Sequence, residues 1–445
     1  MTSTAAPTDL KRELGLLDAT MINVGTMIAS AIFIVPATVA AATHGTALMT
    51  LVWVIGGLVS LLGALSIAEL AAAYPEAGGQ YAYLREAYGT VWAFLYGWAN
   101  FSVINTASIA AIAVGFARYI GFFTPLSETA VRAIAIASIV ALTLLNCRGV
   151  RLGATTQNIL TILKIGALGA LIVTSFVLPG GSASHFQPFW PSASVGQLIG
   201  PFGVAMVAVL WAYDGWIETT YVGSEIVNPG RNLPRSIILS TLIVIALYVL
   251  ASVAYAYVFS PECMAASKLV ASDAARVTMG AVGATFVVIA ILISTLGANN
   301  GIILTAARIP YAMARGGMFF RSQGVVHPRY ATPAVALVTQ GVIASILTAF
   351  GTYDQLFTYV VFAQFVFYAL SASAVIRLRY KAPQVARPYR TWGYPVTPIV
   401  FIAFAIWLVY NTIVETPRDS AIGAGIILLG LPGYYYWRRA GRAGR

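Results

Sequence analysis

The chain alternates between long apolar runs and short polar segments. A run of about 20 apolar residues is long enough to cross the hydrocarbon core of a membrane as an α-helix. We see no strict alternation of apolar and polar residues, which a membrane-spanning β-barrel requires. We therefore predict an all-α integral membrane protein with twelve transmembrane helices, at approximately 15–41, 47–73, 91–120, 130–147, 156–178, 197–224, 236–259, 277–307, 332–350, 354–379, 396–415 and 420–437.

The composition supports the same class, because only 9% of the residues are charged, whereas soluble domains carry about 25%. The net charge of +11 could suggest nucleic-acid binding, but the basic residues lie in short breaks between apolar runs, so we expect no nucleic-acid partner. Cys147 and Cys263 offer neither a metal-binding spacing nor a disulfide framework. The polar N-terminus does not resemble a signal peptide, so we expect the first run to be retained.

Lysine and arginine are distributed unevenly between the two sets of loops. If the N-terminus is cytoplasmic, 20 of them lie on that side and 5 on the other, with Lys164 inside a run. Cytoplasmic loops are the ones enriched in these residues. We therefore expect cytoplasmic tails at 1–13 and 438–445, a single transmembrane domain at 14–437, and a location in a bacterial-type inner membrane.

Two of the predicted spans contain interruptions, in residues 23–36 and 209–225. Irregular backbone at membrane depth is tolerated only inside the protein or around a cavity, and a matching pair of such spans indicates a transporter site. The two spans are five helices apart. This spacing predicts inverted repeats at approximately 15–178 and 197–379, with two further helices at approximately 396–437.

Broken helices expose backbone N–H groups at one break and carbonyls at the other, which together suit a carboxylate and an ammonium. An α-amino acid carries both groups. The alternative is that Gly25 and Gly215 only permit close helix packing. Either glycine alone would favour packing, whereas the pair in register beside Asp214 favours a binding site.

Four stretches resemble one known family: Ala68–Gly89, Asn146–Lys164, Tyr213–Ile237 and the segment RPYRTWGYPVTP within 383–398. They are similar to the amino acid–polyamine–organocation superfamily, and within it to the L-type amino acid transporters and bacterial serine/threonine exchangers. The resemblance covers nearly the whole chain. It implies the five-plus-five inverted-repeat (LeuT-like) fold and alternating access.

The same resemblance implies site residues. The break in the first helix would bind the substrate through backbone groups, Trp211 would be a gate over the substrate, and carbonyls near Trp211 would bind its ammonium. The family usually has Gly-Ser-Gly where this chain has Ala-Ser-Ala, so the site could be tighter or its backbone less freely unwound. The substrate-binding residues implied are Met27, Ile28, Ala29, Ser30, Ala31, Trp211, Ala212 and Asp214.

Lys164 lies inside the fifth run. Intramembrane charges are usually functional, although a lysine could also extend to the interface. The resemblance implies a coupling role, because sodium-independent members carry a lysine where sodium-coupled relatives bind an ion between helices 1, 5 and 8. A fixed charge would favour exchange, whereas a buried lysine that releases its proton would favour proton coupling.

Three carboxylates fall in the sixth run. Asp214 could line the cavity or simply be solvated at the break, and the sequence favours neither. Glu218 would share a helical face with Asp214 if the helix continued, and we expect a structural role for it. Glu225 could form a gate with Arg231 or Arg235, but we expect a solvated helix end.

We therefore predict a sodium-independent secondary transporter of neutral L-amino acids, acting as an exchanger. A proton-coupled symporter and a cationic amino acid or polyamine carrier are the alternatives within transporters, and a channel is the alternative from another class. We find no catalytic cluster, and we expect no enzyme activity, cofactor or metal. Loop 121–129 lacks the cysteine through which related light chains bind a heavy chain, so we expect membrane lipid but no covalent partner.

Overall fold

The fold is built from α-helices, as predicted. The computed structural model describes residues 10–350 and 353–443, and within these ranges β-type pairing is limited to isolated bridges. The α-helices are α1 (Leu16–Met27), α2 (Ala31–Thr43), α3 (Thr46–Ala73), α4 (Gln80–Tyr88), α5 (Thr90–Ala99), α6 (Asn105–Ile120), α7 (Glu128–Cys147), α8 (Val150–Val177), α9 (Val195–Ala212), α10 (Pro229–Val258), α11 (Pro261–Ala266), α12 (Val270–Ala306), α13 (Arg308–Arg315), α14 (Ala334–Phe350), α15 (Tyr353–Lys381), α16 (Val396–Glu415), α17 (Pro417–Leu428) and α18 (Gly430–Ala443).

Many of these helices are long and apolar enough to cross a membrane. Among the described residues there are seven such spans, or eight if α1 and α2, which are bent by 44° at their junction, form one. Two further apolar helices, α9 and α14, are shorter. The prediction of an all-helical, multi-pass membrane protein is confirmed, while the count of twelve stays a prediction.

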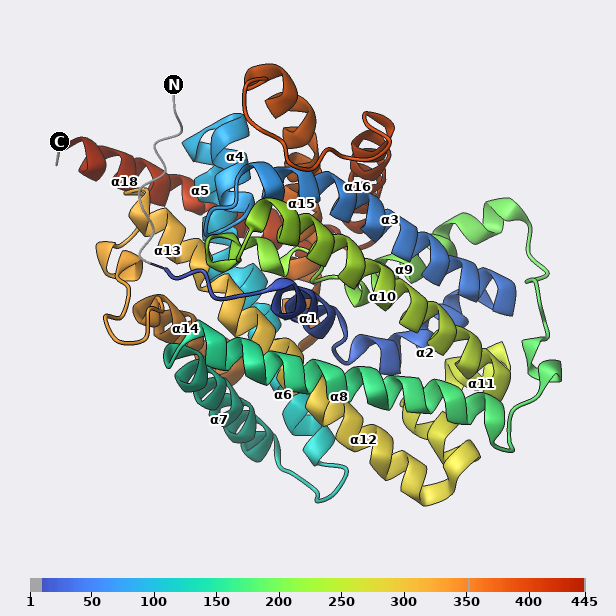
Figure 1. The fold of residues 1–445 in the computed structure, drawn as a ribbon. Coiled ribbons are helices and arrows are strands. Elements are labelled where there is room, and N and C mark those ends of the chain that lie inside the picture. The colour runs from blue at the N-terminus through green and yellow to red at the C-terminus, as the bar shows by residue number, and fades with distance from the viewer. Residues whose placement is uncertain (1–9, 351–352, 444–445) are drawn as a thin grey trace.

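Helix α1 lies near the middle of the bundle. Figure 1 shows α3 and α10 on one side of it and α8 and α12 on the other. Helices α8, α10 and α12 pack against α1 and against one another, and α3 packs against α10. Its residues Ile22, Val24 and Met27 are at most 1% exposed. The end of α1 is therefore surrounded by protein, which is the condition under which a helix can be interrupted at membrane depth.

The predicted helix at 197–224 is wrong in its second half. Helix α9 ends at Ala212, and the chain then continues through turns and the short 3₁₀ segments Glu218–Thr220 and Gly223–Glu225. Gly215 has a φ of +110°, which a right-handed helix does not allow. Because the helix ends before it, Asp214 and Glu218 do not lie on one helical face.

Three other predicted spans have interruptions that apolar patterning does not reveal. The predicted span 277–307 corresponds to the C-terminal part of α12, which ends at Ala306 and has non-helical backbone at Gly280 with a φ of 69°. A π-helical turn at Asn100–Ile104 separates α5 from α6, and the predicted span 420–437 is divided between α17 and α18. Helix α12 is kinked at Gly280, and all three spans still contribute helices to the bundle.

Candidate functional site

The break between α1 and α2 is held by side chains from two other helices. The Ser294 hydroxyl on α12 donates hydrogen bonds to the carbonyls of Ile28 at 2.8 Å and Ala29 at 3.0 Å. The Tyr248 hydroxyl on α10 donates to the Met27 carbonyl at 2.8 Å. These bonds satisfy carbonyls that have lost their helical partners, so the break is a stable feature of the fold.

The end of α9 touches this break directly. The Thr26 hydroxyl on α1 donates to the Gly215 carbonyl at 3.1 Å. A Cβ at Gly215 would lie 2.9 Å from Thr26 Oγ1 and 3.0 Å from the Met27 nitrogen. Gly215 is therefore required by both its turn and its close contact with α1. Gly25 has the packing role, since a Cβ there would overlap Gln157 and Thr161 on α8.

A small cavity of about 60 Å³ lies between the two breaks. Five of the predicted site residues line it, namely Met27, Ala29, Ala31, Trp211 and Asp214, while Ile28, Ser30 and Ala212 do not. The remaining lining residues come from α1, α6, α12, α15 and the segment after α9, and are Thr26, Asn105, Ala107, Ser108, Ala111, Ile112, Gly215, Glu218, Ile302 and Gln364.

The helix termini give this cavity two kinds of backbone group. Helix α2 begins at Ala31, so its first N–H groups have no intrahelical partner, and α9 ends at Ala212, so its last carbonyls have none. The dipoles favour negative charge at the first terminus and positive charge at the second. The methyl groups of Ala29 and Ala31 narrow the cavity, yet the backbone is broken there, so alanine does not prevent unwinding.

Trp211 lies between this cavity and a larger one. The larger cavity has a volume of about 580 Å³, is partly open to the exterior, and is also lined by Trp211. Ser30 lines the larger cavity, on the other side of Trp211 from Ala29 and Ala31. The indole is therefore placed where a change of its rotamer would connect or separate the two spaces.

The side chain of Lys164 is completely buried and does not extend to an interface. Its ammonium donates hydrogen bonds at 2.8 Å to each of the carbonyls of Gly25, Ile28 and Ser294. Gly297 on α12 leaves room for it, since a Cβ there would lie 2.9 Å from Nζ. The ammonium thus joins α1, α8 and α12 directly behind the break.

Both Asp214 and Glu218 line the small cavity. Oδ1 of Asp214 accepts hydrogen bonds from Gln364 Nε2 at 3.0 Å and from the Tyr368 hydroxyl at 2.6 Å. Glu218 accepts a hydrogen bond from the Thr305 hydroxyl. Asp214 is therefore held by α15 at the cavity wall instead of being simply solvated, and Glu218 adds a second carboxylate.

The expectation for Glu225 is wrong. Its carboxylate is completely buried and pairs with Arg308 on α13, with Nε–Oε1 at 2.7 Å and Nη2–Oε2 at 3.0 Å. The backbone N–H groups of Glu13 and Leu14 donate to the Glu225 carbonyl, each at 3.0 Å. This end of the bundle, where α1 begins, is closed, whereas the larger cavity opens at the other end.

Four residues of the site were not predicted from the sequence. Tyr248 and Ser294 hold the break after α1, Gln364 holds Asp214, and Arg308 holds Glu225. The first three are polar groups inside apolar runs, and this position was a usable signal because such groups must find buried partners. Arg308 gave no such signal, because it follows a run like many other arginines.

A buried cavity between the break after α1 and the end of α9 in a multi-pass bundle is the arrangement of a membrane transporter. The amino acid permease family model matches residues 14–434, and the chain belongs to this family of the amino acid–polyamine–organocation superfamily. It is 34% identical to the human b(0,+)-type amino acid transporter 1, over 92% of this chain and 84% of the relative. It is 33% identical to the serine/threonine exchanger SteT of Bacillus subtilis, over 96% and 97% of the two chains.

A third relative is the human large neutral amino acids transporter small subunit 2, at 32% identity over 96% of this chain and 81% of the relative. The predicted family resemblance is confirmed, and so is the prediction of an amino acid transporter instead of an enzyme.

Proposed function

We propose that the chain is a sodium-independent exchanger of small neutral L-amino acids that works by alternating access. The observation that carries this proposal is the cavity between the start of α2 and the end of α9. Donors at one helix terminus would bind the substrate carboxylate, and acceptors at the other would bind its ammonium. The carboxylate-binding part of the site would consist of Met27, Ile28, Ala29, Ser30 and Ala31.

The ammonium-binding part of the site would consist of Trp211, Ala212 and Asp214, with the Trp211 side chain as the gate. The Trp211 carbonyl accepts the N–H of Asp214 at 3.1 Å, and carbonyl oxygens have a second lone pair for a ligand. The small volume of about 60 Å³ and the two alanine methyl groups support a small substrate side chain.

The absence of a sodium requirement is supported by Lys164. Its ammonium lies among three carbonyl oxygens, which are the ligands that a bound cation would otherwise take. A permanent charge at this position favours obligatory exchange. Release of its proton in one state would instead couple transport to protons, and an imposed pH gradient distinguishes the two.

We further propose twelve transmembrane helices in two inverted repeats, at approximately 15–178 and 197–379, followed by two helices at approximately 396–437. The support is that an interruption follows α1 in the first half and α9 in the second.

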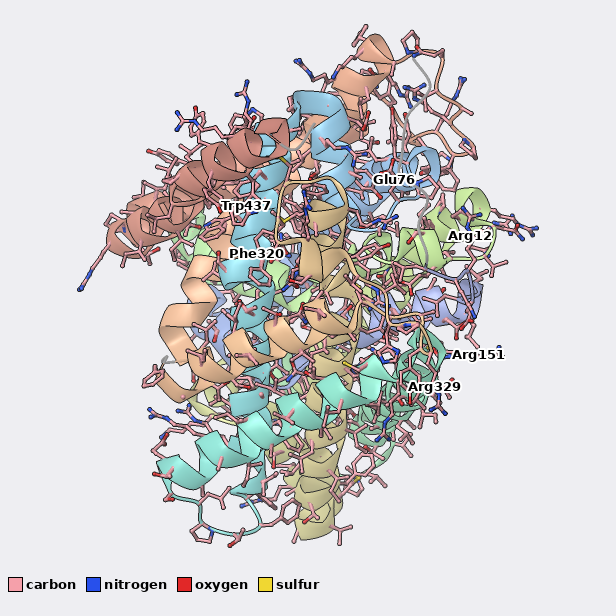
Figure 2. All side chains as sticks on the ribbon, turned by 90° about the vertical axis from the view of Figure 1, so that its left-hand side faces the viewer. Arg12, Glu76, Arg151, Phe320, Arg329 and Trp437 are labelled. Carbon is pink, nitrogen blue, oxygen red and sulfur yellow. The ribbon has the colours of Figure 1, made fainter. Side chains whose placement is uncertain are left out.

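Both termini would lie in the cytoplasm, with tails at 1–13 and 438–445. Figure 2 shows Arg12, Arg151 and Arg329 on the face at which α1 and α8 begin, and cytoplasmic faces are rich in arginine. The structure would then be the state that is closed to the cytoplasm and open to the outside.

One observation favours cationic amino acids as a second candidate. Glu218 and Asp214 place two carboxylates on the cavity wall, and a cationic side chain would need such groups. Asp214 is already held by Gln364 and Tyr368, and the cavity is small, so neutral substrates remain the first candidate.

The protein would also function without a covalent heavy chain. Cys147 lies at the end of α7 and Cys263 on α11, so neither is in the segment 121–127 that joins α6 to α7. A single band at the monomer position on a non-reducing gel of native membranes is expected, and a disulfide-linked heterodimer would refute this.

The substrate class is tested by uptake into liposomes that contain the purified protein. We expect labelled small neutral L-amino acids, such as serine and alanine, to enter faster than lysine or arginine. Glu218→Gln should abolish any residual uptake of lysine and preserve that of serine. Uptake confined to cationic substrates would favour the second candidate.

A further inference from the structure

A third cavity, separate from the proposed substrate site, lies where the N-terminal segment meets the start of α10. It has a volume of about 500 Å³, and its described lining includes three arginines and no acidic residue. The lining residues are Arg12, Asn228, Pro229, Gly230, Arg231, Pro234, Arg235, Pro388 and Tyr389. Three guanidinium groups around one space without a carboxylate repel one another and favour an anionic occupant.

The cavity has three sides, which are the N-terminal segment at Arg12, the start of α10 and the segment 388–389, and backbone contacts hold them together. Leu14, two residues after Arg12, accepts a hydrogen bond from the Val227 N–H at 2.9 Å. Gly230 lies against the ring of Pro388, which a Cβ would approach to 3.1 Å. The arginines therefore project from elements that are held together by the fold.

Tyr389 also lines the cavity. Its hydroxyl oxygen is enclosed by protein beside the backbone of Trp392, so we assign the residue to the cavity wall. The start of α10 adds backbone N–H groups and the positive end of a helix dipole.

The exposed face of α10 continues from the arginines into an apolar stripe. Arg231 and Arg235 are exposed and one turn apart, and Leu239, Leu242 and Leu250 follow on the same helical face. These leucines are 45%, 46% and 50% exposed. An anionic group at the two arginines would thus be followed by apolar surface along α10.

We propose that this cavity binds the headgroup phosphate of an anionic phospholipid, with the acyl chains along Leu239, Leu242 and Leu250. Arg231, Arg235 and Arg12 would contact the phosphate, and Tyr389 would form part of the cavity wall. We favour a lipid over a soluble anion because the arginines lie at one end of an apolar face of a membrane-spanning helix, where acyl chains attached to a bound phosphate would be accommodated. Arg12 would link the bound lipid to the N-terminal segment.

Native mass spectrometry of the full-length protein, titrated with phosphatidylglycerol, tests this site. Phosphatidylcholine with the same acyl chains is the reference lipid. Arg231→Gln/Arg235→Gln should weaken retention of phosphatidylglycerol about 30-fold, because each arginine raises the affinity for an anionic lipid about five- to sixfold. Arg12→Gln should give a smaller loss in the same direction. Arg148→Gln/Arg151→Gln, which removes two exposed arginines beside the start of α8, is the matched control and should leave retention unchanged.

Equal retention by the Arg231/Arg235 variant and the unmodified protein would overturn the proposal, as would an equal loss in the control variant. Displacement of phosphatidylglycerol by inorganic phosphate alone at comparable concentrations would show a soluble-anion site and overturn the lipid assignment. Because both pairs of arginines are exposed, a melting temperature close to that of the unmodified protein should accompany each double variant.

Discussion

The ammonium of Lys164 replaces a bound cation in this account. Lys164→Ala removes this donor from the carbonyls of Gly25, Ile28 and Ser294, of which Ile28 keeps the hydrogen bond from the Ser294 hydroxyl. A buried group left unsatisfied costs about 1–3 kcal/mol. We expect a lower melting temperature and exchange at least about tenfold slower, since losing about 1.4 kcal/mol of transition-state stabilisation is a factor of ten.

Lys164→Met serves as the control for volume, because it keeps most of the side chain and removes the charge. It should recover part of the melting temperature and none of the exchange rate. Exchange by Lys164→Met at the rate of the unmodified protein would show that the charge has no part in turnover.

Trp211 is the residue that lines both the small and the large cavity. Trp211→Ala would merge the two spaces and remove apolar contact with the substrate, worth roughly 1.5 kcal/mol or more. We expect uptake to fall about tenfold with little change in melting temperature, because the side chain is only half-buried. Trp211→Phe should retain most of the activity. Unchanged uptake in Trp211→Ala would contradict the gate assignment.

Among the structural elements, the 3₁₀ segment Gly223–Glu225 and helix α13 are joined by the buried pair Glu225–Arg308. Arg308→Met leaves a carboxylate buried without its partner, which costs roughly 3–5 kcal/mol. We expect a marked fall in melting temperature. Glu225→Gln/Arg308→Met removes both charges and should recover most of it.

The double variant also tests whether the pair closes this end of the bundle. Without the Glu225–Arg308 pair, the state in which this end of the bundle is closed is less favoured. Exchange should therefore stay slower than in the unmodified protein even if the melting temperature recovers. A double variant with full stability and full exchange would identify the pair as structural only.

The two helix breaks show how far patterning along the chain can predict structure. The break after α1 was predictable because a glycine, small polar residues and Pro36 interrupt the apolar run at 15–41. The break after α9 was predicted too, but not that the helix fails to resume. That outcome depends on Gly215 and on Asn23, whose Oδ1 accepts the Thr219 N–H at 2.9 Å from another helix.

Pairs of residues that are distant in sequence could not be predicted either, because they depend on which helices pack together. Glu225 and Arg308 are 83 residues apart, and Lys164 is 130 residues from Ser294. Apolar periodicity reports which face of a helix is buried and not which helix covers it. Trp211 came from the family resemblance, and Lys164 came from its position inside an apolar run together with the resemblance. The contacts of Gln364 and Tyr368 with Asp214 became visible only in the packed bundle.

For the whole molecule, the two native cysteines report the orientation in the membrane. Cys263 is exposed on α11, and Cys147 is half-buried at the end of α7. If both termini are cytoplasmic, a membrane-impermeant maleimide should label Cys263 in intact cells and Cys147 only after permeabilisation. Cys263→Ser should remove the external labelling. External labelling that persists through Cys147 would invert the proposed topology.

Exchange in liposomes tests the central claim most directly. Purified protein is reconstituted in sodium-free choline buffer without a pH gradient, and uptake of labelled serine is compared between liposomes loaded with unlabelled serine and empty ones. We predict rapid uptake into the loaded liposomes and little into the empty ones, because Lys164 supplies a fixed charge and the protein must bind substrate inside before it can return to the outward-facing state. A strict requirement for sodium, or equal uptake into loaded and empty liposomes, would contradict it.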